Sequence, residues 1–209
     1  MSAIFIDLSL VVFVAFISFS GVASAKSISP VDAPWRLAEY MASAQSSPKE
    51  LIATAEKLFA KSTIDASRKD PKLVHAWQDR IAMLSALAHI FDPAEQKSSV
   101  DQQFRAAKII ESATLSDPSL LVRDGAVEAM RRINRMRPGY IARWKSTLEL
   151  AFMQNKNQAS GEGYFIRETI LSAMREASIR PSAKVLNSAR GDTNGRVRAR
   201  LEEWNTSAF

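Results

Sequence analysis

Apolar side chains recur along most of this chain at intervals of three and four residues, the spacing of one face of an α-helix. The clearest stripe consists of Val122, Ala126, Ala129, Met130 and Ile133. No run of β-branched residues alternates with polar residues over four or more positions, so strands are not expected. The pattern therefore predicts an all-α fold. Its helices are expected over residues 33–45, 48–61, 71–91, 100–115, 119–135, 139–154, 162–178, 181–190 and 195–206.

Capping residues mark several of the expected helix starts. Ser47 and Glu50 form a capping box, with Pro48 at the first helical position between them. Asp70 and Asp117 each stand directly before a proline, so each is expected to cap the helix that follows it.

A stretch of ten residues recurs 44 positions further along the chain. Residues 122–131 and 166–175 share four identical positions, among them the arginines at the second and tenth places. The preceding helices match at the same offset, with Val100 opposite Trp144, and a weaker copy begins at Arg80. Periods of 40–47 residues with two helices in each are typical of α-solenoids built from repeats.

One short motif accompanies the repeat: an aspartate, five residues and an arginine, with a valine just before the arginine. Its two copies are Asp117, Val122 and Arg123, and Asp192, Val197 and Arg198. A middle copy keeps Ile166 and Arg167 but has Gly161 where the aspartate is expected, so the aspartate contact is not expected there. This motif resembles the second-helix signature of HEAT repeats.

The resemblance implies one domain over residues 26–209, with the weakest match over 26–70. Its expected fold is a right-handed α-solenoid of about four helix pairs, whose second helices line the concave side. Terminal units that cap the stack are expected at 33–62 and 182–204. In each turn the aspartate is expected to cap the next helix and to pair with the arginine. The aspartates and arginines of the motif are thus structural residues in this interpretation.

The first 25 residues differ from the rest of the chain. An apolar run covers 8–19, and Ala23, Ser24 and Ala25 form an A-x-A cleavage pattern, as in a secretory signal peptide. No basic residue precedes the run, so an uncleaved membrane anchor and a buried core helix are the alternatives. A periplasmic or secreted protein is expected, and the absence of cysteine is compatible with export. No later segment reaches the length of a membrane span, so no stable span is expected after cleavage.

The residues that usually carry chemistry form no recognisable constellation. The two histidines, His75 and His89, lie on one expected helix about 21 Å apart, too far to share a metal. The aspartate at 192 begins a faint calcium-loop pattern, but Arg196 and Arg198 occupy ligand positions. No metal and no cofactor are therefore expected. Trp144 and Trp204 fall on apolar faces, where core packing is expected rather than ligand stacking.

Charge gives the best functional indication. The net charge is +6, and residues 121–209 carry sixteen basic side chains, thirteen of them arginines, against nine acidic ones. Arg131 and Arg175 occupy matched repeat positions, so they are expected to stack about 10 Å apart. Arginine is suited to forked contacts with carboxylate or phosphate. The predicted partner- or anion-binding residues are Arg131, Arg132, Arg135, Arg137 and Arg175. The alternative is a solvated face neutralised by Glu128, Glu168 and Glu176.

Three functions follow from these observations. The preferred one is an exported, non-enzymatic scaffold that binds a protein partner through a concave, arginine-rich face. The second is a protein that binds an anionic polymer, such as nucleic acid or an envelope polymer, through the same surplus of arginine. The third is an enzyme whose carboxylate site has no recognisable motif. The fold alone does not decide among them, since one fold hosts many functions.

Overall fold

The computed structural model describes residues 47–70, 76–94, 98–158 and 161–206, and all of them belong to one compact unit. This part of the chain is helical and contains no strand, which confirms the predicted all-α class. The expected signal segment 1–25, the expected helix 33–45 and His75 lie outside the described residues.

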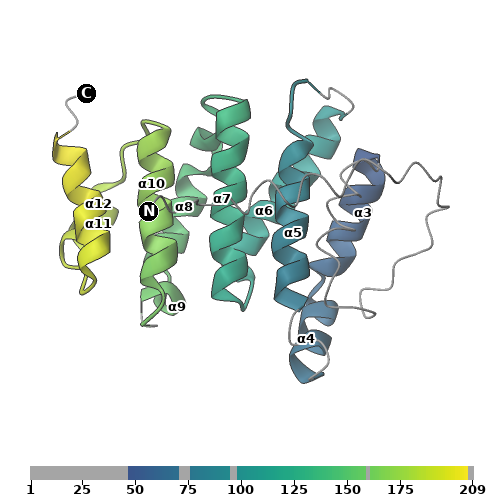
Figure 1. Cartoon of the computed structure of the whole chain (residues 1–209), viewed down its shortest axis with the longest axis horizontal. Coiled ribbons are helices and arrows are strands. Elements are labelled where there is room, and N and C mark those ends of the chain that lie inside the picture. The colour runs from purple at the N-terminus through teal and green to yellow at the C-terminus, as the bar shows by residue number, and fades with distance from the viewer. Residues whose placement is uncertain (1–46, 71–75, 95–97, 159–160, 207–209) are drawn as a thin grey trace, which may run out of the picture. The chain divides into compact units, whose positions relative to one another are not determined.

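Four helices form a first row, called the α7 row below, in which each helix contacts the next (Figure 1). Leu120–Met136, the helix α7, contacts helices on both of its sides in this row. In chain order the members of the row are α5 (Ala76–His89), α7 (Leu120–Met136), α10 (Tyr164–Glu176) and α12 (Gly195–Thr206).

Four further helices form a second row, called the α6 row, which packs against the first. Its members, again in contact one after another, are α3 (Pro48–Leu58), α6 (Val100–Ser116), α8 (Lys145–Met153) and α11 (Ala183–Arg190). The chain alternates between the two rows, and helices that follow one another pack across them: α6 contacts α7, α8 contacts α10, and α11 contacts α12. The starts of α5, α7 and α10 are 44 residues apart, whereas α12 begins 31 residues after α10.

The predicted apolar stripes form the core between the rows. Val122, Met130 and Ile133 on α7 are fully buried, and so are Ile166 and Met174 on α10. Burial of this kind contributes roughly 1.5–3 kcal/mol for each large aliphatic side chain. Stacked helix faces therefore stabilise this cysteine-free fold.

The two tryptophans assigned to apolar faces are core residues. Trp144 is 3% exposed and Trp204 is 7% exposed, so the predicted core packing is confirmed. The ring of Trp144 also meets the ring of Tyr140 edge to face, with centroids 5.2 Å apart.

The capping box at Ser47 is confirmed, but the role predicted for Asp117 is wrong. The hydroxyl of Ser47 accepts the backbone N–H of Glu50, and the Glu50 carboxylate accepts the N–H of Ser47. At the start of α7 the capping residue is Ser119, whose hydroxyl accepts the N–H of Val122. Asp117 instead ends α6 and accepts the N–H of Ser119, because its carboxylate is held by another helix.

Two expected helices are interrupted. The helix expected over 48–61 ends at Leu58, and a separate helix α4 (Lys61–Lys69) follows the extended residue Ala60. The helix expected over 139–154 begins with the 3₁₀ helix η2 (Tyr140–Trp144) before α8. The tighter 3₁₀ turn places Ile141 and Trp144, three residues apart, on the same buried side. No helix in the described ranges is both long and apolar enough to cross a membrane.

Candidate functional site

Buried ion pairs connect helices of the α7 row to the turns that lead into the next helix of that row. The guanidinium of Arg80, on α5, binds the carboxylate of Asp117 through two hydrogen bonds, Nε to Oδ2 at 2.8 Å and Nη2 to Oδ1 at 3.2 Å. Arg167, on α10, binds Asp192 in the same forked way, at 2.7 Å and 2.9 Å. All four side chains are almost completely buried. In both cases the carboxylate lies in the turn just before one α7-row helix and binds the arginine of the preceding helix in that row.

The arginine six residues after each of these aspartates binds the backbone of the turn instead of the carboxylate. Arg123 donates to the carbonyl oxygens of Asp117 and Pro118, at 2.8 Å and 3.0 Å. Arg198 donates in the same way to the carbonyl of Asp192. The predicted pairing within each motif therefore exists, but it is made to the carbonyl oxygen and not to the carboxylate.

Asn157 completes the series where the sequence indicated a gap. Its Oδ1 accepts a hydrogen bond from Nε of Arg123 at 3.0 Å, and its backbone carbonyl accepts one from Arg167. It lies on the short helix α9 (Asn155–Gln158) and is fully buried. No aspartate makes this contact among the described residues, as Gly161 led us to expect, and Asn157 takes its place. Arg80, Arg123, Arg167 and Arg198 form one arginine ladder along the α7 row.

The two arginines expected to stack are each bound to carboxylates. Arg131 binds Glu128 on its own helix and Glu176 on α10, and Arg175 binds Glu203 on α12. Each arginine therefore connects its helix to the next helix in the row. The alternative of a partly neutralised face describes these two positions better than a row of unpaired cations.

The remaining predicted arginines do not gather into one site. Arg132 donates to the hydroxyl of Ser85 at 3.0 Å, and its Nη2 lies 2.7 Å from Nε2 of His89. Arg137 donates to the carbonyl of Phe91 at 2.7 Å, and so supports the loop after α5. Arg135 is exposed on α7.

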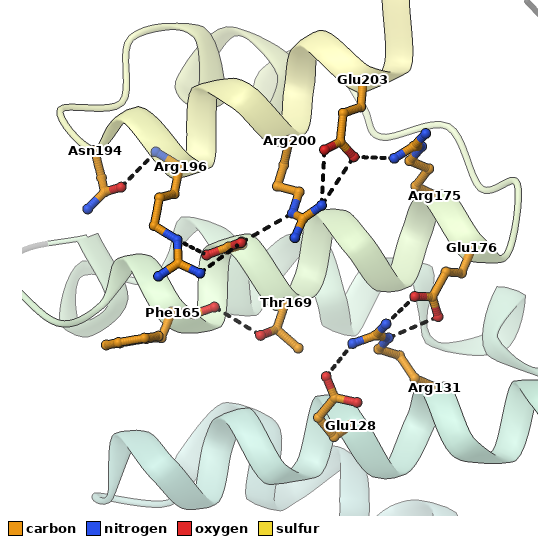
Figure 2. A network of polar contacts seen from close by, with 11 residues as sticks. Glu128, Arg131, Phe165, Thr169, Arg175, Glu176, Asn194, Arg196, Arg200 and Glu203 are labelled. Atoms are coloured by element: carbon orange, nitrogen blue, oxygen red, sulfur yellow. Dashed lines mark hydrogen bonds and ion pairs between the residues drawn. The ribbon is translucent and has the colours of Figure 1, made fainter. Parts of the chain in front are cut away.

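A polar hollow, called the charged cavity below, opens between α7, α10 and α12. Its volume is about 460 Å³. Figure 2 shows the ion pairs that surround it. Four arginines and three glutamates line it: Arg131, Arg175, Arg196, Arg200, Glu168, Glu176 and Glu203. Only Arg131 and Arg175 of the predicted binding residues belong to it.

Glu168 organises the α12 side of the charged cavity. Its carboxylate binds Nε of Arg196 at 3.0 Å and Nε of Arg200 at 3.2 Å. The glutamate side chain is 11% exposed, whereas Arg196 is 62% exposed and Arg200 is 40% exposed. One nearly buried carboxylate thus holds two accessible guanidinium groups side by side. Sequence reasoning missed both arginines as binding candidates, although both lie in the arginine-rich C-terminal part.

A second carboxylate, on α7, forms no salt bridge with any described residue. Asp124 occupies the α7 position that matches Glu168 on α10, and no described group donates a hydrogen bond to its Oδ1. Burial raises the pKa of Asp124, while a hydrogen bond with Thr169 lowers it and the neighbouring Glu128 raises it further. The folded protein therefore binds the proton of Asp124 more tightly than the unfolded chain does.

We expect Asp124→Asn to make the protein more stable than the wild type at pH 7. A carboxyl whose pKa is higher in the folded state binds its proton more tightly there, so stability falls as pH rises from the unfolded pKa, about 3.9, through the folded pKa. The amide that replaces the carboxyl in the variant does not titrate, so the variant avoids this loss of stability. The difference in unfolding free energy between the variant and the wild type should therefore shrink toward zero in acid. Urea unfolding at several pH values measures it, with the exposed Glu202→Gln as control. A wild type that is the more stable at pH 7 contradicts the prediction.

The described residues contain no group of three or more histidine, aspartate or glutamate side chains placed to hold a metal ion. No protein-family model matches the chain, and no curated protein or solved structure matches it either. The arrangement of the site therefore has to be interpreted from its own chemistry.

Proposed function

We propose that the chain is an exported helical-repeat scaffold that binds a protein partner on the exposed face of its α7 row. The observation that carries this proposal is the charged cavity, an open hollow of arginines and glutamates formed jointly by three helices of one row. Such a hollow offers forked hydrogen-bond donors at fixed positions, and arginine is enriched where proteins bind one another.

The proposed architecture is a right-handed, HEAT-like α-solenoid of about four helix pairs. Two features support it: helices alternate between two rows in contact order, and the arginine ladder repeats from turn to turn. In such a solenoid the α7 row contains the second helix of each pair and lines the concave side. The proposal of export rests on the apolar run and the A-x-A pattern in residues 1–25. Intact-mass spectrometry of the mature protein tests it, and the expected mass is that of a chain that begins at Lys26.

Exposed apolar side chains accompany the arginines on the same row. Leu121 on α7 is 49% exposed, and Phe165, at the matched position on α10, is 43% exposed. Apolar anchors beside arginine are the composition of binding hot spots. A partner that covers both positions would bury this apolar surface and also contact the charged cavity, which Phe165 lines.

Photo-crosslinking tests the proposed face. We expect benzoylphenylalanine at position 121 to give a defined protein adduct in extracts of the producing cells, and the same group at position 150 to give none. Leu150 is a matched control because it is also an exposed leucine, at 59%, but lies on α8 in the other row. Equal adducts from both positions, or none from position 121, would exclude this face as the binding surface.

An anionic polymer is the second candidate, and the sixteen basic against nine acidic residues of the C-terminal part favour it. Its expected behaviour is retention on heparin that falls steeply with salt, because phosphate or sulfate contacts release counterions. Such retention without a protein adduct from position 121 favours the polymer over a protein partner.

A further inference from the structure

The charged cavity has the size and the donors of a small receptor site. Its volume of about 460 Å³ falls in the range of cavities that hold small ligands or a few side chains. Three helices contribute to its walls, so the groups that line it are held by the packing of the α7 row.

Donors remain available on the two arginines that Glu168 positions. Arg196 uses Nε and Nη2 for Glu168, and Arg200 uses Nε for Glu168 and Nη1 for Glu203. No described residue accepts a hydrogen bond from Nη1 of Arg196 or Nη2 of Arg200. Both side chains are accessible to solvent, so an incoming oxygen anion can replace water at these nitrogens.

The charge of the lining indicates what kind of anion fits. On the α12 side of the cavity three arginines, Arg175, Arg196 and Arg200, are paired with only two glutamates, Glu168 and Glu203, which leaves a surplus of one positive charge there. Arg131, on the α7 side, is already bound by both Glu128 and Glu176. A single carboxylate neutralises this surplus. A phosphate group carries about −1.5 to −2 at neutral pH and would leave the site negative. The balance therefore favours a carboxylate over a phosphate.

One wall of the cavity is apolar. Phe165 lines it and stacks on Tyr164, with ring centroids 4.2 Å apart and an interplanar angle of 27°. The guanidinium of Arg196 lies 5.7 Å from the centre of the Tyr164 ring. An aromatic or aliphatic group bound next to the carboxylate would therefore contact a fixed ring while its anion contacts Arg196.

We propose that the charged cavity binds a peptide carboxylate flanked by an apolar side chain, with Arg196 and Arg200 as the anion donors and Phe165 as the apolar wall. This inference rests on the proposed function, because the peptide is a segment of the partner protein. The carboxylate comes from an acidic side chain or from the C-terminus of the partner. Glu168 is a positioning residue that holds the two guanidinium groups in place.

Peptide titration of the purified chain tests the proposal directly. The first probe is a labelled, acetylated and amidated peptide with a central glutamate between two phenylalanines. We expect saturable binding, weaker by about tenfold or more when the glutamate is replaced by glutamine. A matched peptide with a free C-terminal phenylalanine and no acidic side chain distinguishes the two sources of carboxylate. The proposal is overturned if the glutamate and glutamine peptides bind with equal affinity. It is also overturned if neither the glutamate peptide nor the peptide with the free C-terminus binds.

Variants locate the site. Arg196→Gln should weaken binding of the glutamate peptide by about tenfold or more, and Arg190→Gln, on the exposed end of α11, should leave it unchanged. Thermal unfolding checks that both variants fold. Equal losses in both variants overturn the assignment. So does a phosphoserine peptide that binds more than about tenfold tighter than the glutamate peptide, since it indicates a phosphate site.

The outcome separates this inference from the broader function. If the peptides fail to bind while position 121 still gives its protein adduct, the cavity assignment fails and the proposed face stands. If the glutamate peptide binds but position 121 gives no adduct, the cavity stands and the larger face fails.

Discussion

Replacing Asp117 by asparagine is expected to lower the free energy of unfolding by about 3–5 kcal/mol, because the buried guanidinium of Arg80 then lacks a counter-charge. The Asp117 side chain is completely covered and that of Arg80 is 5% exposed, so water cannot replace the lost carboxylate. The amide oxygen still accepts the N–H of Ser119, which confines the loss to the ion pair. Urea unfolding followed by circular dichroism measures the change.

An exposed ion pair supplies the control for this experiment. Arg105 binds Glu56 at 2.6 Å between α6 and α3, but the two side chains are 42% and 46% exposed. Glu56→Gln should therefore lower the free energy of unfolding far less than Asp117→Asn, because exposed ion pairs contribute little. The interpretation of the arginine ladder as a connection between repeats is wrong if Asp117→Asn costs no more than Glu56→Gln.

Local spacing made much of the fold predictable. The stripe through Val122 and Ile133 is set by the helical period, and both residues are buried as expected. Arg123, Arg167 and Arg198 could be identified because their repeat-matched positions are visible in the chain. The partner of Asp117 could not be identified in this way. Arg80 begins the weaker copy of the repeat, but it precedes Asp117 by 37 residues on another helix, and local spacing does not indicate a pairing over that distance.

Similarity between repeats misled where the surroundings differ. Val100 and Trp144 occupy matched positions at an offset of 44, yet Val100 is 84% exposed and Trp144 is 3% exposed. Val100 begins a regular α-helix behind its capping residue, whereas Trp144 ends the 3₁₀ helix that turns it into the core. A match in residue type therefore predicted the helix but not its buried face.

The charged cavity was the least predictable feature. Counting charges identified the arginine-rich part of the chain, but it could not assign Glu176 to Arg131 or Glu203 to Arg175, which lie 45 and 28 residues apart. Arg196 was missed as a binding residue because its own repeat is shorter than the others. The available signal was Glu168, an acidic residue at the matched position of Asp124, inside a segment of otherwise core-like pattern.

Asn157→Leu is the second variant with a large expected effect, roughly 2–4 kcal/mol of lost unfolding free energy. The leucine cannot accept the hydrogen bond from Nε of Arg123, and it cannot donate to the carbonyl of Ala151, which now receives the Asn157 amide at 2.7 Å. One charged donor and one backbone acceptor are then left buried without a partner. The same urea titration detects the loss.

A variant of the neighbouring Gln158 separates the contribution of the arginine ladder from that of the local turn. Its amide donates to the carbonyl of Phe152 at 2.7 Å, just as that of Asn157 donates to a carbonyl six residues earlier. No hydrogen bond joins Gln158 to a described ladder arginine. Gln158→Leu should cost about 1 kcal/mol, and the excess for Asn157→Leu is then the contribution of Arg123. Equal losses would mean that Asn157 only closes its own turn. A clearly larger loss for Asn157→Leu means that the Asn157 amide joins two repeats, as the carboxylates of Asp117 and Asp192 do in the other turns. This holds although Arg167 follows Asn157 by ten residues, whereas the arginines of the other two turns follow their aspartates by six.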